Sequence, residues 1–215
     1  MTNEYRGTRY PVFGFITGGK GVLNDGIPPQ PYETFAYDLA LLEASIENFN
    51  VIPYTSVLPP ELRGNLVTIT DTVNRKFPYL PYHPELTEQF HHGAVLEAII
   101  AGHGANYTEH KAIATGIGIV WAKNKGKFIG GFAAEYVQLY DSIINDDIAR
   151  AEAHMWLNKS LDHELTIRGL EQEGEKDMFH NFLNIPENNP FGYCLTCIGF
   201  LNFKYAPPIS QTEKM

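Results

Sequence analysis

Apolar and polar positions alternate over much of the chain, in runs that end at glycine, proline or charged residues. Such runs, rich in β-branched and aromatic residues, favour strands. The pattern predicts six strands: Pro11–Thr17, Asn50–Leu58, Gly93–Ala101, Ala114–Ala122, Lys127–Leu139 and Phe191–Tyr205. Residues Lys123-Asn124-Lys125-Gly126 between the fourth and fifth are typical of a hairpin turn. The Gly93–Ala101 run also fits a helix.

Apolar residues recur at helical spacing in other stretches. The first runs from Pro31 to Ile46, with an apolar stripe formed by Phe35, Leu39, Leu42 and Ile46. The second spans Ile143–Ile167 and carries acidic residues in its first turn, and a shorter helix is expected over Glu171–Asn184. We expect loops at Gly18–Gly21 and Gly102–His110, an irregular covering section over Glu61–His92, and a loose tail from Pro207.

Ser56 lies where the Asn50–Leu58 strand meets the Pro59-Pro60 corner. Backbone geometry is often forced at such a place. The chain has five serines, and Ser56 has the most constrained local context among them. Most Thr-Ser pairs before a turn only hydrogen-bond the turn, so this stretch alone favours a structural interpretation.

Two carboxylates occupy unusual positions. Asp38 is roughly 60° from the centre of the apolar stripe of its helix, at 3.6 residues per turn. Glu135 is the one charge on a strand face that otherwise carries Ile129, Gly131, Ala133 and Val137. Burial of Glu135 would raise its pKa and keep it protonated, as a general acid requires. For both residues a structural pairing and a role in a site remain open at this point.

Length, charge and composition narrow the class of protein. The 215 residues fit a single domain, and the net charge of −9 argues against nucleic acid and anionic membranes as partners. No apolar run reaches the ~18 residues that span a bilayer. Residues 1–10 lack the apolar core of a secretory signal, so we expect a cytoplasmic protein.

Cysteine and histidine do not form a recognisable metal or redox motif. Cys194 and Cys197 are three residues apart on a predicted strand, which places them on opposite faces, so we expect two core thiols and no disulfide. Five of the eight histidines fall at irregular spacing in predicted loops: His83, His91, His92, His103 and His110. This spacing does not match a zinc ligand set, and we predict no metal. No Gly-x-Ser-x-Gly elbow of a serine hydrolase is present either.

Several stretches together resemble the pyruvoyl-dependent arginine decarboxylases, most closely the chlamydial acid-resistance type. They are Thr17-Gly-Gly, Pro28-Pro-Gln-Pro-Tyr-Glu-Thr-Phe35, Tyr37-Asp-Leu-Ala-Leu-Leu42, Ile46 through Pro59, His92-Gly-Ala-Val-Leu-Glu97, Ala112 through Ile119, Ile129-Gly-Gly-Phe-Ala-Ala-Glu-Tyr136 and Gly199-Phe-Leu-Asn-Phe203. The likeness covers nearly the whole chain. Ser45 departs from the glycine that many members carry after the residue equivalent to Ala44.

The resemblance implies a fold and a set of roles. The fold would be a single α+β domain over residues 1–215, an αββα sandwich of antiparallel sheets flanked by helices, assembled as a homotrimer with sites between subunits. The precursor would cut itself between Thr55 and Ser56 into residues 1–55 and 56–215, leaving a pyruvoyl group made from Ser56. Asn50 would assist the cut, Asp38 would bind the substrate's guanidinium, and Glu135 would be the catalytic acid.

The implied reaction converts L-arginine to agmatine and CO₂, and it would serve acid resistance or polyamine supply. Because a pyruvoyl ketone is an electron sink for decarboxylation of amino acids in general, a pyruvoyl decarboxylase of another amino acid is the nearer rival. A binding or structural protein of the same fold that no longer cleaves itself is the second rival.

Overall fold

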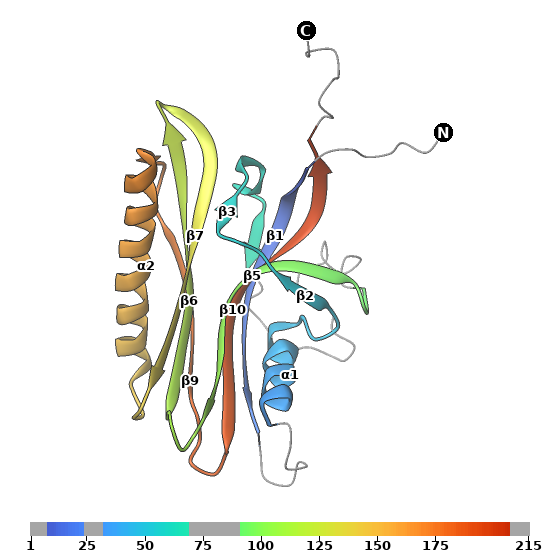
Figure 1. Ribbon diagram of the computed structural model, residues 1–215, viewed down its shortest axis with the longest axis vertical. Coiled ribbons are helices and arrows are strands. Elements are labelled where there is room, and N and C mark those ends of the chain that lie inside the picture. The colour runs from blue at the N-terminus through green and yellow to red at the C-terminus, as the bar shows by residue number, and fades with distance from the viewer. Residues whose placement is uncertain (1–7, 24–31, 69–90, 207–215) are drawn as a thin grey trace.

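The computed structural model describes residues 8–23, 32–68 and 91–206, and these form four layers. Two sheets pack face to face in the middle, with one helix on each outer side (Figure 1). Sheet A has the strand order β2-β5-β10-β1-β4, and sheet B the order β3-β7-β6-β8, with β9 also paired to β6. The predicted αββα sandwich is confirmed, and its single domain holds all the described residues.

Sheet A contains β1 (Arg9–Val22), β2 (Asn50–Pro53), β4 (Leu66–Thr68), β5 (Val95–Asn106) and β10 (Phe191–Tyr205). Sheet B contains β3 (Val57–Leu58), β6 (Ala112–Asn124), β7 (Lys127–Tyr140), β8 (Glu171–Gln172) and β9 (Asp177–Asn184). The long strands pair antiparallel as predicted, including the β6–β7 hairpin. Two short strands of sheet A instead pair parallel, β2 with β5 and β4 with β1.

Apolar side chains fill the three spaces between the layers. Ile99, Ile117, Ile198 and Phe200 lie in the cluster between the two sheets. Helix α2 (Asp146–Arg168) covers sheet B with a stripe of small and branched residues: Ala149, Ala153, Leu157, Leu161 and Leu165. Because each layer buries one face of its neighbour, the described chain has a continuous core.

Residues Gly18–Gly21, predicted as a loop, lie within β1. Helix α1 (Tyr32–Ala44) packs directly onto this part of the strand. A Cβ at Gly19 would lie 2.0 Å from the carbonyl oxygen of Ala40, and a Cβ at Gly21 would lie 2.0 Å from that of Ala36. Only glycine allows a helix backbone to approach a strand this closely. The loop prediction for Gly18–Gly21 was therefore wrong for a packing reason that the sequence pattern does not reveal.

The helix predicted over Glu171–Asn184 is also wrong, since that segment forms β8 and β9. Strand β9 pairs with β6 along Ala112–Ile119 and alternates its side chains. Met178 and Phe182 pack with helix α2, while Phe179 packs between the sheets. The neighbouring strand edge thus overrides the local pattern.

Other differences are smaller. Strand β5 continues to Asn106, so the predicted loop begins later than Gly102. Of the irregular section Glu61–His92, the described part holds the short helix η1 (Pro60–Leu62) and β4; residues 69–90 and the tail from Pro207 lie outside the described residues. Neither described helix offers an apolar stretch of bilayer-spanning length.

The two cysteines are core thiols, as predicted. Both are free and buried in β10, and burial raises the pKa of each thiol to about 12. Among the described residues, no group of three or more histidine, cysteine or acidic side chains is arranged to hold a metal. His83 lies outside the described residues.

Candidate active site

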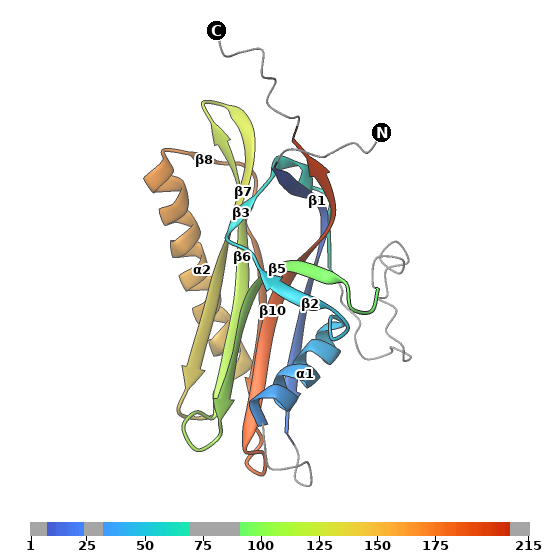
Figure 2. The same cartoon turned by 45° about the vertical axis from the view of Figure 1, so that its right-hand side comes forward.

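Ser56 lies where the chain crosses from one sheet to the other. Strand β2 ends at Pro53 on the edge of sheet A, and β3 begins at Val57 on the edge of sheet B. The crossing is visible between the two sheets in Figure 2. The predicted single strand over this stretch is thus two short strands, with the Thr55–Ser56 bond between them.

Backbone hydrogen bonds fix the chain on both sides of the Thr55–Ser56 bond. The N–H of Tyr54 donates to the Ala98 carbonyl in sheet A at 2.7 Å. The N–H of Ala133 in sheet B donates to the Ser56 carbonyl at 2.8 Å. Ser56 itself is half-buried and Thr55 is exposed. The bond therefore spans two separately anchored points, an arrangement that limits the conformations open to it.

A hollow of about 480 Å³ lies against this segment. Its walls are the start of β1 from Arg9 to Pro11, residues of the crossing that include Tyr54 and Thr55, and Ile129 from the β6–β7 hairpin. The hollow brings together parts of the chain that are more than forty residues apart in sequence. A chemical change at Thr55 would therefore take place at the hollow that Arg9 also lines.

Glu135 lies close to Ser56 on the same sheet. Strand β7 pairs with β3, and Ser56 stands opposite Ala133 through the hydrogen bond above. Glu135 follows two residues later, roughly 7 Å along the strand. Its side chain shares the face of Ala133, which packs between the sheets, as the period-two pattern predicted.

The surroundings of Glu135 favour its neutral form. The residue is exposed in the isolated chain, yet the partial desolvation of its carboxyl group raises its pKa, as the sequence led us to expect. A carboxylic acid that holds its proton nearer to neutral pH can act as a proton donor.

A charged network that sequence reasoning missed supports the crossing from the side of sheet A. Arg9 donates to the buried carboxylate of Glu97. Burial is the largest cause of the raised pKa of Tyr54, and its hydrogen bond to Glu97 is the second. The centre of the Tyr54 ring lies 5.5 Å from that of Phe200. The available signal was Glu97 itself, a lone carboxylate in the apolar run from Val95 to Ile100.

Asn50 lies at the other end of β2. Its side-chain amide donates to the Gly93 carbonyl at 2.9 Å, and its backbone N–H donates to Ala94. Three residue steps of an extended strand separate it from Pro53 by roughly 10 Å. Within one chain this side chain therefore anchors the start of β2 and does not lie on Thr55.

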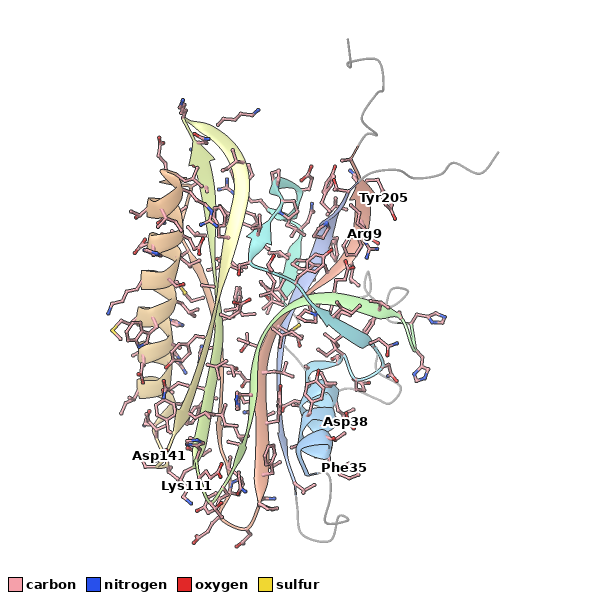
Figure 3. The ribbon with its side chains drawn as sticks, viewed as in Figure 1. Arg9, Phe35, Asp38, Lys111, Asp141 and Tyr205 are labelled. Atoms are coloured by element: carbon pink, nitrogen blue, oxygen red, sulfur yellow. The ribbon has the colours of Figure 1, made fainter. Side chains whose placement is uncertain are left out.

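Asp38 lies apart from the crossing, on helix α1. The predicted stripe of that helix was wrong in part, since Phe35, Leu39 and Leu42 face away from sheet A and only Ile46 is buried. They line an open hollow of about 400 Å³ together with Asp38 and Glu47. Figure 3 shows Asp38 beside Phe35 on the helix, and Arg9 in a different part of the molecule. One chain thus brings Ser56, Thr55 and Glu135 together but keeps Asp38 and Asn50 elsewhere.

Comparison with known proteins identifies the family. The pyruvoyl-dependent arginine decarboxylase family matches residues 14–205. The chain belongs to this family. Proteins named pyruvoyl-dependent arginine decarboxylase AaxB are similar over nearly their whole length: that of Chlamydia pneumoniae is 53% identical over 204 residues, covering 94% of this chain and 96% of the relative. The protein of Chlamydia muridarum is 52% identical, covering 94% and 97%, and that of Chlamydia abortus 52%, covering 95% and 97%.

Members of this family depend on a covalent pyruvoyl group, and the residues present fit one. The resemblance implies that such a group forms from a serine, here Ser56. Ser56 is half-buried between two fixed points, and a carboxyl group whose neutral form is favoured lies on the adjoining strand.

Proposed function

We propose that this protein decarboxylates L-arginine to agmatine and CO₂ with a pyruvoyl group that it makes from its own Ser56. The observation that carries the proposal is the Thr55–Ser56 bond held between two sheets, with Glu135 on the adjoining strand. Family membership supports the type of cofactor, and the names of the relatives support arginine as the substrate.

In the first step, the hydroxyl of Ser56 attacks the carbonyl carbon of Thr55. The peptide bond breaks as an ester forms, and the fixed flanks keep the two groups close. Elimination from Ser56 then releases Thr55 as a carboxylate, and hydrolysis with loss of ammonia leaves the pyruvoyl group at position 56. The products are residues 1–55 and 56–215.

Asn50 assists this cleavage in our proposal. Its amide would stabilise the oxyanion that develops on the Thr55 carbonyl. Since its hydrogen bond to Gly93 holds it at the far end of β2, this contact requires the Asn50 of another subunit. Within its own chain, Asn50 anchors the start of β2 on β5 and so supports the crossing that leads to Thr55.

A bound pyruvoyl group would supply an electron sink for the pair left on the substrate's α-carbon as CO₂ departs. Glu135 then donates a proton to that carbon from its carboxyl group. The raised pKa of Glu135 supports this role, because the neutral acid is the form that donates.

Asp38 binds the guanidinium of arginine through paired, charge-assisted hydrogen bonds. Because Asp38 and Thr55 line different hollows in one chain, a complete site requires two subunits, in agreement with the trimer that we propose. The apolar side chains around Asp38 would cover the methylene groups of the substrate. A cytoplasmic location and a role in acid resistance also belong to this proposal, since decarboxylation consumes a proton.

A denatured mass spectrum of the purified protein tests the cleavage. The wild type should give two chains, 1–55 and 56–215, the second with a pyruvoyl terminus. Ser56→Ala should remain at full length and be inactive, because it lacks the attacking hydroxyl. Ser142→Ala is the matched control, since Ser142 is an exposed serine outside the site and its loss should leave both chains and activity intact.

The outcomes separate the candidate functions. Cleavage of Ser56→Ala at the same bond would show that Ser56 is not the nucleophile. An intact wild-type chain would favour the non-cleaving rival. Cleaved protein that yields no agmatine from arginine, but an amine from another amino acid, would favour the other decarboxylase.

A further inference from the structure

The guanidinium of Arg9 is held at the wall of the hollow beside Thr55. One of its nitrogens donates to Glu97, and its Cζ lies 4.7 Å from the centre of the Phe203 ring. The side chain is still 45% exposed. A guanidinium has five N–H donors, and the described residues accept from one of its nitrogens. Arg9 is therefore oriented but has donors available for a second anion.

The proposed cleavage creates an anion at this place. When the ester between Thr55 and Ser56 undergoes elimination, a base removes the α-hydrogen of Ser56, and the bond between its Cβ and Oγ breaks. That oxygen and its electron pair leave with Thr55, which becomes a carboxylate. Elimination is faster when the charge on the leaving group is stabilised as it develops.

The charges around the hollow suit a carboxylate at Thr55 only if Arg9 is present. Of the residues that line the hollow, Arg9 is the one with a positive charge. The buried carboxylate of Glu97, on the strand that pairs with β2, would repel a second one nearby. A guanidinium between them can serve both, because its planar fork offers donors in two directions.

We infer that Arg9 receives the Thr55 carboxylate that self-cleavage creates and assists its departure from Ser56. The inference rests on the proposed function, and it assigns to the start of β1 a part in making the pyruvoyl group. Glu97 is then a positioning residue, which fixes the guanidinium at the wall of the hollow. After the cut, the same contact holds the new end of the 1–55 piece away from position 56.

The test is the kinetics of cleavage in Arg9→Gln. The ester should accumulate, because its formation does not need Arg9 while its breakdown does. We expect elimination to slow by about tenfold or more, less than the ~10²–10³ typical of a donor in a closed oxyanion site, since Arg9 is partly exposed. The ester has the mass of the precursor, but hydroxylamine at neutral pH splits it into 1–55 ending in a hydroxamate and 56–215 beginning with serine.

Arg63→Gln is the matched control. Arg63 also stacks on a phenylalanine ring, Phe128 at 4.8 Å, and pairs with a glutamate, Glu173 at 3.2 Å, but it does not line the hollow. It should show no ester and wild-type kinetics. A general loss of stability from removing a surface arginine would affect both variants, whereas a hydroxylamine-sensitive ester in Arg9→Gln alone supports the inference.

Wild-type cleavage kinetics in Arg9→Gln, with no ester trapped, would overturn the inference and leave the proposed function intact. A wild-type chain that never cleaves would instead refute the proposed function. If Arg9→Gln does not fold, Arg9→Lys decides. Its ammonium serves as a point charge without the fork, so ester should still accumulate, and wild-type kinetics there would overturn the inference equally.

Discussion

Substitutions of Glu135 and Asp38 are expected to affect different kinetic parameters, kcat for Glu135 and KM for Asp38. Glu135→Gln should cleave itself normally, bind arginine and lose most of kcat, because an amide cannot deliver the proton. Asp38→Asn should raise KM, with a loss of roughly 2–5 kcal/mol in arginine binding if the guanidinium is desolvated against it. Steady-state kinetics on fully processed protein measure both. If Glu135→Gln changed only KM and Asp38→Asn only kcat, the two roles would be reversed.

The pKa of Glu135 also sets the expected pH dependence. Desolvation raises this pKa, and in the proposed reaction the protonated form is the one that donates. Activity should therefore be full below the raised pKa and should fall as the pH rises through it. The pH profile of kcat for the wild type checks this, and the residual activity of Glu135→Gln should lack that descending limb. A descending limb that persists unchanged in Glu135→Gln would assign the titration to another group.

Ser45 is strained by its position after helix α1. It has φ of 68°, a left-handed conformation that costs most residues roughly 1–2 kcal/mol, and its buried hydroxyl has no partner among the described residues. Ser45→Gly should raise the free energy of unfolding by about 0.5–1 kcal/mol after the greater backbone entropy of glycine is subtracted. Urea denaturation in the uncleaved Ser56→Ala background measures this. Ser45→Ala keeps the strain and separates the contribution of the hydroxyl; equal gains in both variants would contradict the strain argument.

At the scale of elements, the sequence predicts those that have a regular apolar pattern. The β6–β7 hairpin and the last strand follow from periodicity and turn residues, and both helices are predicted near their observed positions, although the stripe predicted for α1 is wrong in part. Strand β9 is not predicted, because its conformation depends on the edge of β6. The end of β1 is not predicted either. Its glycines allow a close approach of helix α1, which only the tertiary structure reveals.

In the candidate site, too, some residues stand out in the local sequence and others are brought together only by the fold. Ser56 and Glu135 stand out locally, one at a proline corner and one on an apolar face. Arg9 and Glu97 are separated by 88 residues and become a pair only when β1, β5 and β10 lie side by side. Local pattern therefore predicts the groups that we propose to react, but not the groups that hold them in place.

The docking of β3 on β7 should control self-cleavage, and Gly130 permits that docking. Gly130 has φ of 121°, and a Cβ there would lie 2.4 Å from the Leu58 carbonyl oxygen. Gly130→Ala should displace β3, destabilise the protein by roughly 1–3 kcal/mol and slow the cut, because Ser56 loses its fixed flank. Time courses of cleavage on denaturing gels measure the rate.

Gly126→Ala is the control for this prediction. Gly126, at the turn of the same hairpin, also has a positive φ of 75° but no atom within 4 Å of an added Cβ. It should cost about 1 kcal/mol of stability from the backbone alone and leave the cleavage rate unchanged. Equal slowing in the two variants would mean that hairpin stability, and not the position of β3, limits the reaction.

At the scale of the whole molecule, the two pieces should stay together after cleavage. The 1–55 piece contributes α1, β1 and β2, and β1 lies inside sheet A between β10 and β4. Its removal would expose the core on both sides of sheet A. We expect the pieces to elute together in gel filtration, at the position of uncleaved Ser56→Ala, and to separate only in denaturant. Loss of the 1–55 piece under native conditions would contradict this.

The interior place of β1 also gives maturation a fixed order. The precursor subunit is one chain, so its folding before assembly is a unimolecular step. If the chain is cut as proposed, unfolding of a subunit releases two molecules that must meet again, and the formation of each subunit then becomes bimolecular. A chain cut before β1 has entered sheet A would face the same bimolecular search, so the cut is useful only in a molecule that has already folded.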